Sequence, residues 1–289
     1  MLSIVILSGL GLGSMYGLIA LGFTLTFMVS GTVNFAQGSS VMLGAVLCYE
    51  LAVDLKLPMF PAISVSLAVC ALWGYAVERV AVRPFASRGS NAWLMATVAL
   101  GIVLDNLVMA LFGKEPRALP SALADEPILI AGVGIYPLQL IIPVVGIVLA
   151  VALHVVIRHS GLGLRLMAAV QNKAAARLMG IDVDRLVAGT YMVAAALAGI
   201  GGILVAPLFN VAYDMGTLFG IKAFAVAILG GIVNPWGVVL AGLLYGLVEA
   251  ASTAYLGSSN TQIVSFSLVI LALSVAPNGL FTRMQRVKV

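Results

Sequence analysis

Long apolar segments alternate with short polar breaks along almost the whole chain. A helix needs roughly 20 apolar residues to span a bilayer. Nine segments reach or approach that length, at about 4–29, 36–53, 58–78, 91–112, 136–157, 187–209, 218–233, 237–256 and 262–277. The break at 30–35 is short enough to be a kink or a re-entrant turn, so eight and nine spans both stay open. The pattern predicts an all-α, polytopic membrane protein.

Composition supports this class. Only 9% of the residues are charged, 62% are hydrophobic, and the first charged residue is Glu50. A soluble protein of this size needs more charge to cover its surface. A transmembrane barrel would show short segments alternating with period two, which these are not. We treat residues 1–289 as a single membrane domain, and we expect the first apolar stretch to be a span and not a cleaved signal peptide, because no basic region precedes it.

The basic residues predict the orientation. Eleven fall in one set of loops: Arg79, Arg83, Arg88, Arg158, Arg165, Lys173, Arg177, Arg185, Arg283, Arg286 and Lys288. The opposite loops hold three, namely Lys56, Lys114 and Arg117. Cytoplasmic loops are enriched in Lys and Arg, so the first set is expected inside. With nine spans the C-terminus is then cytoplasmic, the N-terminus lies outside, and 113–135 is an external loop.

The polar segment 158–186 is unusual in such a chain. Leu164 to Met179 contains good helix formers and no proline, with apolar residues at three- and four-residue spacing, which predicts one short amphipathic helix. Gly180 suits the left-handed position that ends a helix. Two interpretations stay open: an interfacial helix bound to anionic lipid headgroups, or a helix that docks in a groove of a cytoplasmic protein.

Five polar residues fall within or beside the spans. Asp105, Lys222 and Glu249 are costly at membrane depth. They either pair with one another or line a translocation path, where an ammonium and a carboxylate would steer a zwitterion. Asn34 and Gln37 lie in the glycine-flanked break 31–38, which is either an ordinary cytoplasmic turn or a broken-helix element facing a pathway. We place all five as candidate substrate-path residues.

Small residues recur at helix-packing spacing. Gly13 and Gly17, and likewise Gly242 and Gly246, form G-x-x-x-G motifs that allow helices to approach closely. A glycine pair at 201–202 is interpreted as packing, with a gating hinge as the alternative.

The loop resembles a known motif. The run Ala174 to Gly180 is similar to the cytoplasmic EAA loop of ATP-binding-cassette importer permeases, with Ala174 where that pattern has glutamate. In that family the short helix inserts into a cleft of the ATPase subunit. The resemblance implies a set of coupling residues, which are Arg165, Ala168, Lys173, Ala174, Ala175, Ala176, Arg177 and Gly180.

A second resemblance runs nearly end to end. Residues 16–22, 33–38, 78–84, 222–224, 229–237 and 265–266 look like the first permease subunit of the branched-chain amino acid import system. It implies a type II importer-like fold in the bacterial inner membrane and a hydrophobic amino acid substrate. The partners it implies are a second homologous permease, two cytoplasmic ATP-binding subunits and a periplasmic or extracellular substrate-binding protein, besides membrane lipid and without nucleic acid.

No motif in the chain indicates an enzyme. The G-x-x-x-x-G-K-[ST] phosphate loop is missing from the sequence. We expect no cofactor or metal in this chain, with ATP and Mg²⁺ bound by the partner subunits. The alternative function is an autonomous ion-coupled carrier or channel for a small polar solute, in which Asp105, Lys222 and Glu249 would relay a proton or an ion.

Overall fold

The computed structural model describes residues 2–125, 127–130 and 133–281. Each of the nine predicted apolar segments coincides with a helix. The helices are α1 (Leu2–Ser30), α2 (Gln37–Tyr49), α3 (Met59–Val77), α4 (Arg83–Ala86), α5 (Trp93–Phe112), α6 (Ala122–Asp125), α7 (Pro137–His159), α8 (Gly161–Gln171), α9 (Lys173–Leu178), α10 (Val183–Val205), α11 (Met215–Gly230), α12 (Pro235–Leu256) and α13 (Ser258–Val275). Strands β1 (Ile128–Ile130) and β2 (Val133–Ile135) pair antiparallel in the predicted external loop.

Within the described residues, seven helices are long and apolar enough to cross a membrane: α1, α5, α7, α10, α12, α13 and the stretch Met59–Ala86 that joins α3 to α4. The apolar α11 is shorter, with 16 residues, and α2 has 13 before a π-helical turn continues it from Glu50 to Asp54. The all-α membrane fold is therefore confirmed. The short hairpin β1–β2 is an addition that the apolar pattern did not predict.

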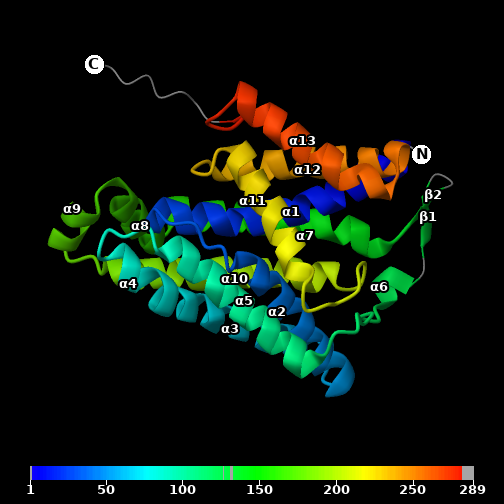
Figure 1. Ribbon diagram of the computed structural model, residues 1–289, viewed down its shortest axis with the longest axis horizontal. Helices are drawn as coiled ribbons and strands as arrows, with labels where there is room; N and C mark the ends of the chain where they lie inside the picture. The colour runs from blue at the N-terminus through cyan, green and yellow to red at the C-terminus, as the bar shows by residue number, and fades with distance from the viewer. Residues whose placement is uncertain (1, 126, 131–132, 282–289) are drawn as a thin grey trace.

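Helix α1 occupies the centre of the bundle. It packs against α12, α10, α7 and α11, and Figure 1 shows α12 and α13 on one side of it and α2, α3, α5 and α10 on the other. It starts at the end of the molecule that carries β1–β2 and finishes at the end that carries α4, α8 and α9 (Figure 1). The described members of the two basic groups thus lie at opposite ends of the bundle, as the charge pattern predicts, while Arg283, Arg286 and Lys288 lie outside the described residues.

The two G-x-x-x-G motifs pack against each other. A Cβ placed on Gly13 would lie 2.6 Å from the carbonyl oxygen of Gly242 and 2.7 Å from Leu243 Cα, which is closer than side chains tolerate. The backbones of α1 and α12 therefore touch. Gly202 likewise lies against the backbone of Val41 on α2. Close helix packing explains these glycines, and the hinge alternative at 201–202 has no observation in its favour.

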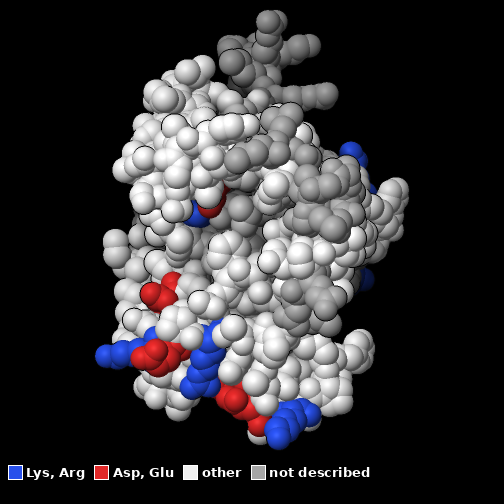
Figure 2. Space-filling model, turned by 90° about the vertical axis from the view of Figure 1, so that its right-hand side faces the viewer, with Lys and Arg blue, Asp and Glu red and all other residues white. Residues whose placement is uncertain are grey.

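Charges at the β1–β2 end gather along one edge of that face (Figure 2). Arg117 lies 3.3 Å from Asp54 Oδ2 and 3.6 Å from Glu50 Oε1, and its guanidinium packs over the ring of Phe112. This cluster fastens the loop after α5 to the end of α2. The rest of the face is mostly uncharged, apart from a recessed hollow that shows one basic and one acidic side chain (Figure 2).

Candidate functional site

The break between α1 and α2 is buried inside the bundle. Gly31 has a φ of +76° and ends α1, after which residues 32–36 run back between the helices. Asn34 and Gln37 are fully buried. The Asn34 side-chain oxygen accepts from Ala36 N, and Gln37 Nε2 donates 2.8 Å to the Ala194 carbonyl on α10. This is a buried broken-helix element, held by a local hydrogen bond at Asn34 and by one from Gln37 to α10, and it is not an exposed cytoplasmic turn.

A pocket of about 270 Å³ lies where this element meets α5 and α11. Asp105, Ser39 and Thr217 supply polar groups to its wall, and three phenylalanines supply the apolar part: Phe23, Phe35 and Phe224. The rings of Phe23 and Phe35 both contact that of Phe224, at 5.5 and 5.2 Å between centroids. Asp105 Oδ1 is buried and has no hydrogen-bond partner among the described residues.

The other two ionisable candidates for the substrate path, Lys222 and Glu249, contact each other. Lys222 Nζ on α11 lies 2.6 Å from Glu249 Oε1 on α12, and the two side chains are 6% and 9% exposed. Tyr16 OH on α1 donates to the same carboxylate oxygen at 3.1 Å. In the described part of the chain Asp105 forms no ion pair with either. Lys222 and Glu249 therefore pair, as one of the two interpretations expected, and a role in the substrate path stays a prediction.

The loop 158–186 contains two helices, α8 and α9, so the prediction of one continuous helix from Leu164 to Met179 was wrong. Asn172 separates them with an extended backbone, and its side-chain oxygen accepts from Ala175 N at 3.0 Å. Asparagine at this position caps a new helix better than it continues an old one. Gly180 has a φ of +78°, as its predicted end-of-helix role requires. Asp182 then caps α10 through Arg185 N.

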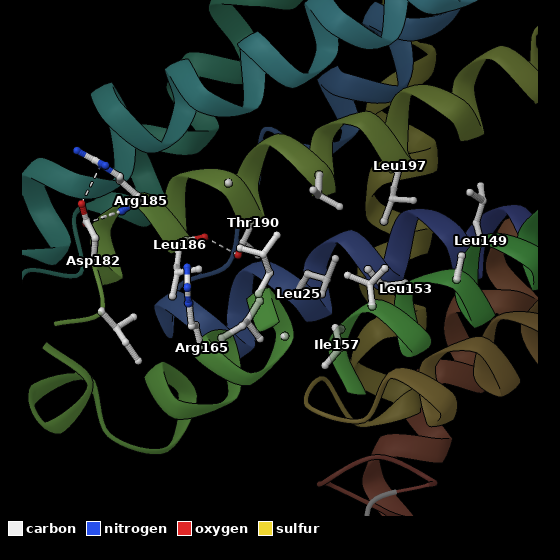
Figure 3. A pocket seen from close by; sticks show the side chains of 18 of the residues that line it. Leu25, Leu149, Leu153, Ile157, Arg165, Asp182, Arg185, Leu186, Thr190 and Leu197 are labelled. Atoms are coloured by element: carbon white, nitrogen blue, oxygen red, sulfur yellow. Dashed lines mark hydrogen bonds and ion pairs between the residues drawn. The ribbon is translucent and has the colours of Figure 1, made fainter. Parts of the chain in front are cut away.

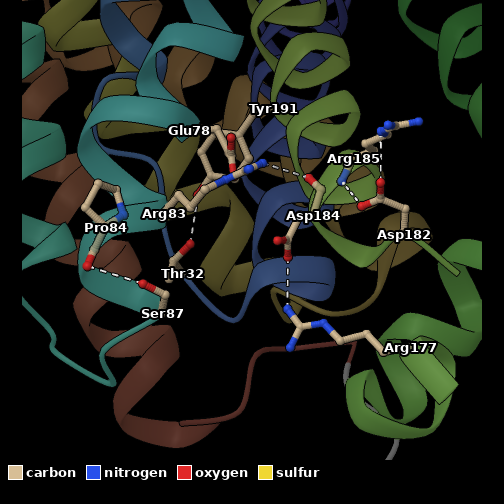
Figure 4. A network of polar contacts seen from close by, with 10 residues as sticks. All are labelled: Thr32, Glu78, Arg83, Pro84, Ser87, Arg177, Asp182, Asp184, Arg185 and Tyr191. Atoms are coloured by element: carbon tan, nitrogen blue, oxygen red, sulfur yellow. Dashed lines mark hydrogen bonds and ion pairs between the residues drawn. The ribbon is translucent and has the colours of Figure 1, made fainter.

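A polar network ties α9 to the bundle (Figure 4). Arg177 forms a 2.9 Å ion pair with Asp184 at the start of α10. Arg83 donates to the backbone oxygen of Asp184 and pairs with the buried Glu78 at 2.9 Å. The network thereby joins the consecutive helices α9 and α10 to Arg83 at the start of α4, which lies 101 residues before Asp184 in the sequence.

Lys173 forms a second contact between α9 and the bundle. Its Nζ donates 2.7 Å to the carbonyl of Ser30, the last residue of α1, where unpaired carbonyls and the helix dipole favour a cation. Partial loss of water, together with nearby Arg177, lowers the pKa of Lys173. From Ser30 the contacts continue to Thr32, whose hydroxyl lies 2.7 Å from Tyr191 OH on α10. A hydrogen-bonded route thus leads from α9 to the broken-helix element.

The predicted coupling residues differ in exposure. Arg165, Lys173, Ala174, Ala175, Arg177 and Gly180 are exposed, Ala168 is half-buried, and Ala176 is buried with Ala169 and Val183. Among the large apolar residues of the loop, Leu178 (89%) and Met179 (82%) at the end of α9 are the most exposed. Neither Leu178 nor Met179 was among the predicted coupling residues. The sequence did contain a clue to this exposed tip, namely two consecutive apolar residues directly before the glycine that ends α9.

Sequence reasoning also missed Tyr16, Ser39 and Thr217. Tyr16 was noted as part of a family-like stretch, with no indication that it contacts Glu249 from 233 residues away. Serine and threonine on apolar helices are common, so nothing local distinguished Ser39 and Thr217. Only the packing of α2, α5 and α11 places them beside Asp105.

The sequence profile described as "Branched-chain amino acid transport system / permease component" matches residues 5–273. The chain belongs to this permease family. It is 33% identical over 298 residues to the high-affinity branched-chain amino acid transport system permease protein LivH of Salmonella typhimurium, covering 98% of this chain and 96% of that one. It is also 33% identical to the corresponding protein BraD of Pseudomonas aeruginosa, covering 98% and 97%.

More distant relatives extend the comparison. The ribose import permease protein RbsC of Haemophilus influenzae is 26% identical over 93% of this permease and 84% of its own length. A chain in the structure "PsaBC from Streptococcus pneumoniae in complex with Fab" superposes with a TM-score of 0.52 at 12% identity, covering 94% of this permease and 91% of that chain. This likeness shows the fold. The relatives are transporter permeases and not enzymes, and this permease is a multi-pass membrane protein.

Proposed function

We propose that this permease is the transmembrane subunit of an ATP-binding-cassette importer for branched-chain or other hydrophobic amino acids in the bacterial inner membrane. Family membership and the names of its relatives support the substrate class. The end that carries α4, α8 and α9 faces the cytoplasm, because it gathers the basic loops. The N-terminus is then outside. ATP and Mg²⁺ bind to two partner ATPase subunits, and this chain holds no cofactor.

The observation that carries the proposal is the end of α9. Leu178 and Met179 are almost fully exposed there, and α9 projects beyond the rest of the bundle (Figure 1). A cap at Asn172, the turn at Gly180 and the Arg177–Asp184 ion pair hold this apolar tip in place. An exposed apolar pair on a fixed support suits a groove in a partner protein. We assign Ala174, Ala175, Leu178 and Met179 to the ATPase contact.

Movement of the ATPase subunits reaches the bundle through Lys173 and Arg177. Lys173 holds the end of α1, and Arg177 holds the start of α10. Thr32 and Tyr191 join those two helices beside the broken-helix element. A displacement of α9 would therefore pull on both walls of that element at once, which is what alternating access requires of a coupling loop.

The pocket at Asp105 is the proposed substrate site of this chain. A volume of about 270 Å³ suits a small solute. The unpartnered carboxylate oxygen of Asp105 would receive the ammonium group of an amino acid, and the phenylalanine rings would contact its hydrocarbon side chain. Asn34, Gln37 and Lys222 form internal hydrogen bonds, so we assign them to structural support. Glu249 joins them through Oε1, which contacts both Lys222 and Tyr16, while its Oε2 has no partner among the described residues.

Two further partners follow from the family resemblance. A second, homologous permease subunit would cover an exposed apolar face such as that of α5, the helix of Asp105, where Met95, Val103 and Leu111 are exposed. A substrate-binding protein would dock at the end that carries β1–β2.

The docking proposal is tested with the full complex of two permeases and two ATPases. We expect Leu178→Asp together with Met179→Asp to abolish co-purification of the ATPase subunits, because two carboxylates would be buried in an apolar groove. Leu55→Asp is the matched control, since Leu55 is 65% exposed at the opposite end. Normal assembly and normal substrate-stimulated ATP hydrolysis in the double variant would refute the docking site.

The substrate site has its own test. Asp105→Asn is expected to raise the KM for amino acid uptake roughly tenfold to a hundredfold, as the loss of one charged hydrogen bond implies. Asn106→Ala, an exposed position on the same helix, is the control. An unchanged KM in Asp105→Asn would remove the pocket from the path. Uptake by this chain alone in liposomes, without ATPase subunits, would instead favour the ion-coupled carrier.

A further inference from the structure

A second groove of the described structure lies apart from the Asp105 pocket, and Met179 at the end of α9 lines one side of it. It has a volume of about 890 Å³ and lies between α1, α7, α8 and α10 (Figure 3). Figure 3 shows Leu25, Leu149, Leu153 and Leu197 at one end of it and Arg165 and Arg185 at the other. The groove therefore has an apolar part among the spans and a basic part at the end that carries α8.

The polar groups of the lining are few and mostly satisfied. The Thr190 hydroxyl donates to the Leu186 carbonyl on its own helix. Arg185 is paired with Asp182 at 2.9 Å. Arg165 forms no ion pair with any residue in the ranges that the structure describes, and its side chain extends along the groove (Figure 3). One positive charge thus faces this end of the groove without a compensating carboxylate.

The length of the groove matches one leaflet of a bilayer. Arg185 and Leu197 line its two ends on α10 and are twelve residues apart. At 1.5 Å per residue this is about 18 Å, close to half of the roughly 30 Å hydrocarbon core plus the start of the headgroup layer. A ligand that fills the groove must be apolar over that length and anionic at one end.

We propose that this groove binds one acyl chain of an anionic phospholipid, with the headgroup phosphate at Arg165. Basic pockets between membrane helices on the cytoplasmic side recognise such headgroups. The proposal also changes the assignment of Arg165, which belongs to the lipid site and not to the ATPase contact formed by Leu178 and Met179. Because α8 forms one wall of the groove, a bound lipid would fix the helix that precedes α9.

Gly189 provides a variant that should not disturb the fold. It lies on α10 in the groove wall, and a Cβ placed there meets no atom within 4 Å. The side chain of Gly189→Leu therefore starts in open space and occupies part of the groove, and leucine is a better helix former than glycine. Arg165→Ala removes the charge while leaving the groove open. Arg88→Ala, an exposed arginine at the same end of the bundle, is the matched control.

The experiment measures lipid retention by native mass spectrometry of the complete transporter, after exchange into micelles that contain phosphatidylglycerol or phosphatidylcholine. We expect one tightly held phosphatidylglycerol per copy of this chain. Arg165→Ala should weaken its retention about fivefold, Gly189→Leu should abolish it, and Arg88→Ala should leave it unchanged.

Three results would overturn the proposal. Equal retention of the two lipids would show that the basic end does not select a headgroup. Unchanged phosphatidylglycerol in Gly189→Leu would place the lipid elsewhere. Loss of the second permease subunit in Gly189→Leu, with lipid binding intact in Arg165→Ala, would show that the groove is a protein interface.

Discussion

The pair of Lys222 and Glu249 allows a quantitative test of what holds the bundle together. At 2.6 Å between Nζ and Oε1, and with an effective dielectric constant of about 20, the Coulomb attraction is about 6 kcal/mol. Removing the two ions from water costs several kcal/mol each, so the net contribution of the intact pair is small. Replacing only Lys222 or only Glu249 costs much more stability, because the remaining buried charge has no opposite charge beside it.

We therefore expect Lys222→Met to destabilise the protein by about 3–5 kcal/mol. Glu249 keeps only the hydrogen bond from Tyr16 in that variant. The double variant Lys222→Met with Glu249→Leu should recover most of the stability, since it replaces both ions by apolar groups of similar size.

The measurement is a thermal melting curve of the purified protein in detergent, followed by ATP-driven uptake into proteoliposomes that contain the complete transporter. The single variants should melt well below the wild type, and the double variant should melt near it and transport normally. A double variant that is stable but does not transport would refute the structural assignment and place the pair in the substrate path. A Lys222→Met variant that melts like the wild type would refute the buried pair itself.

Three further predictions concern packing and coupling. Gly13→Ala should destabilise the protein by about 1–3 kcal/mol in the same melting assay, because its Cβ would lie 2.6 Å from a carbonyl oxygen of α12, whereas at Gly17 the nearest atom is 3.6 Å away. Gly17→Ala should thus be neutral or slightly stabilising, and equal effects at the two positions would contradict the helix contact. Asn172→Ala should remove the cap of α9 at a cost of about 0.5–2 kcal/mol and reduce substrate-stimulated ATP hydrolysis, while full stimulation would show that α9 need not be preformed. Lys173→Met should lower coupling but not assembly of the ATPase subunits, since its ammonium contacts Ser30 and not the exposed tip; loss of assembly would move Lys173 into the docking surface.

Local sequence predicted much of the fold but little of the site. The apolar segments, the glycine that ends α9 and the grouping of basic loops at one end each depend on a few consecutive residues. The break at 172 was missed because the alanine-rich run around it is helix-forming on both sides. Asparagine is only slightly more favourable at a helix cap than in a helix interior, so its type alone does not predict a break. The break at Asn172 lets Ala169 of α8 pack against Ala176 of α9 and Val183 of α10.

The sequence by itself determined which segments enter the membrane, which loops share an end and where close helix contacts form. These properties follow from hydrophobic length, charge and residue size, all of which are local. Only the tertiary structure decided that Lys222 meets Glu249 and Tyr16, that Asp105 shares a phenylalanine-lined pocket with Ser39 and Thr217, and that Arg165 faces a lipid-sized groove. Apolar helices of this length can pack in many arrangements, and the partner of each polar group depends on which arrangement brings distant segments together.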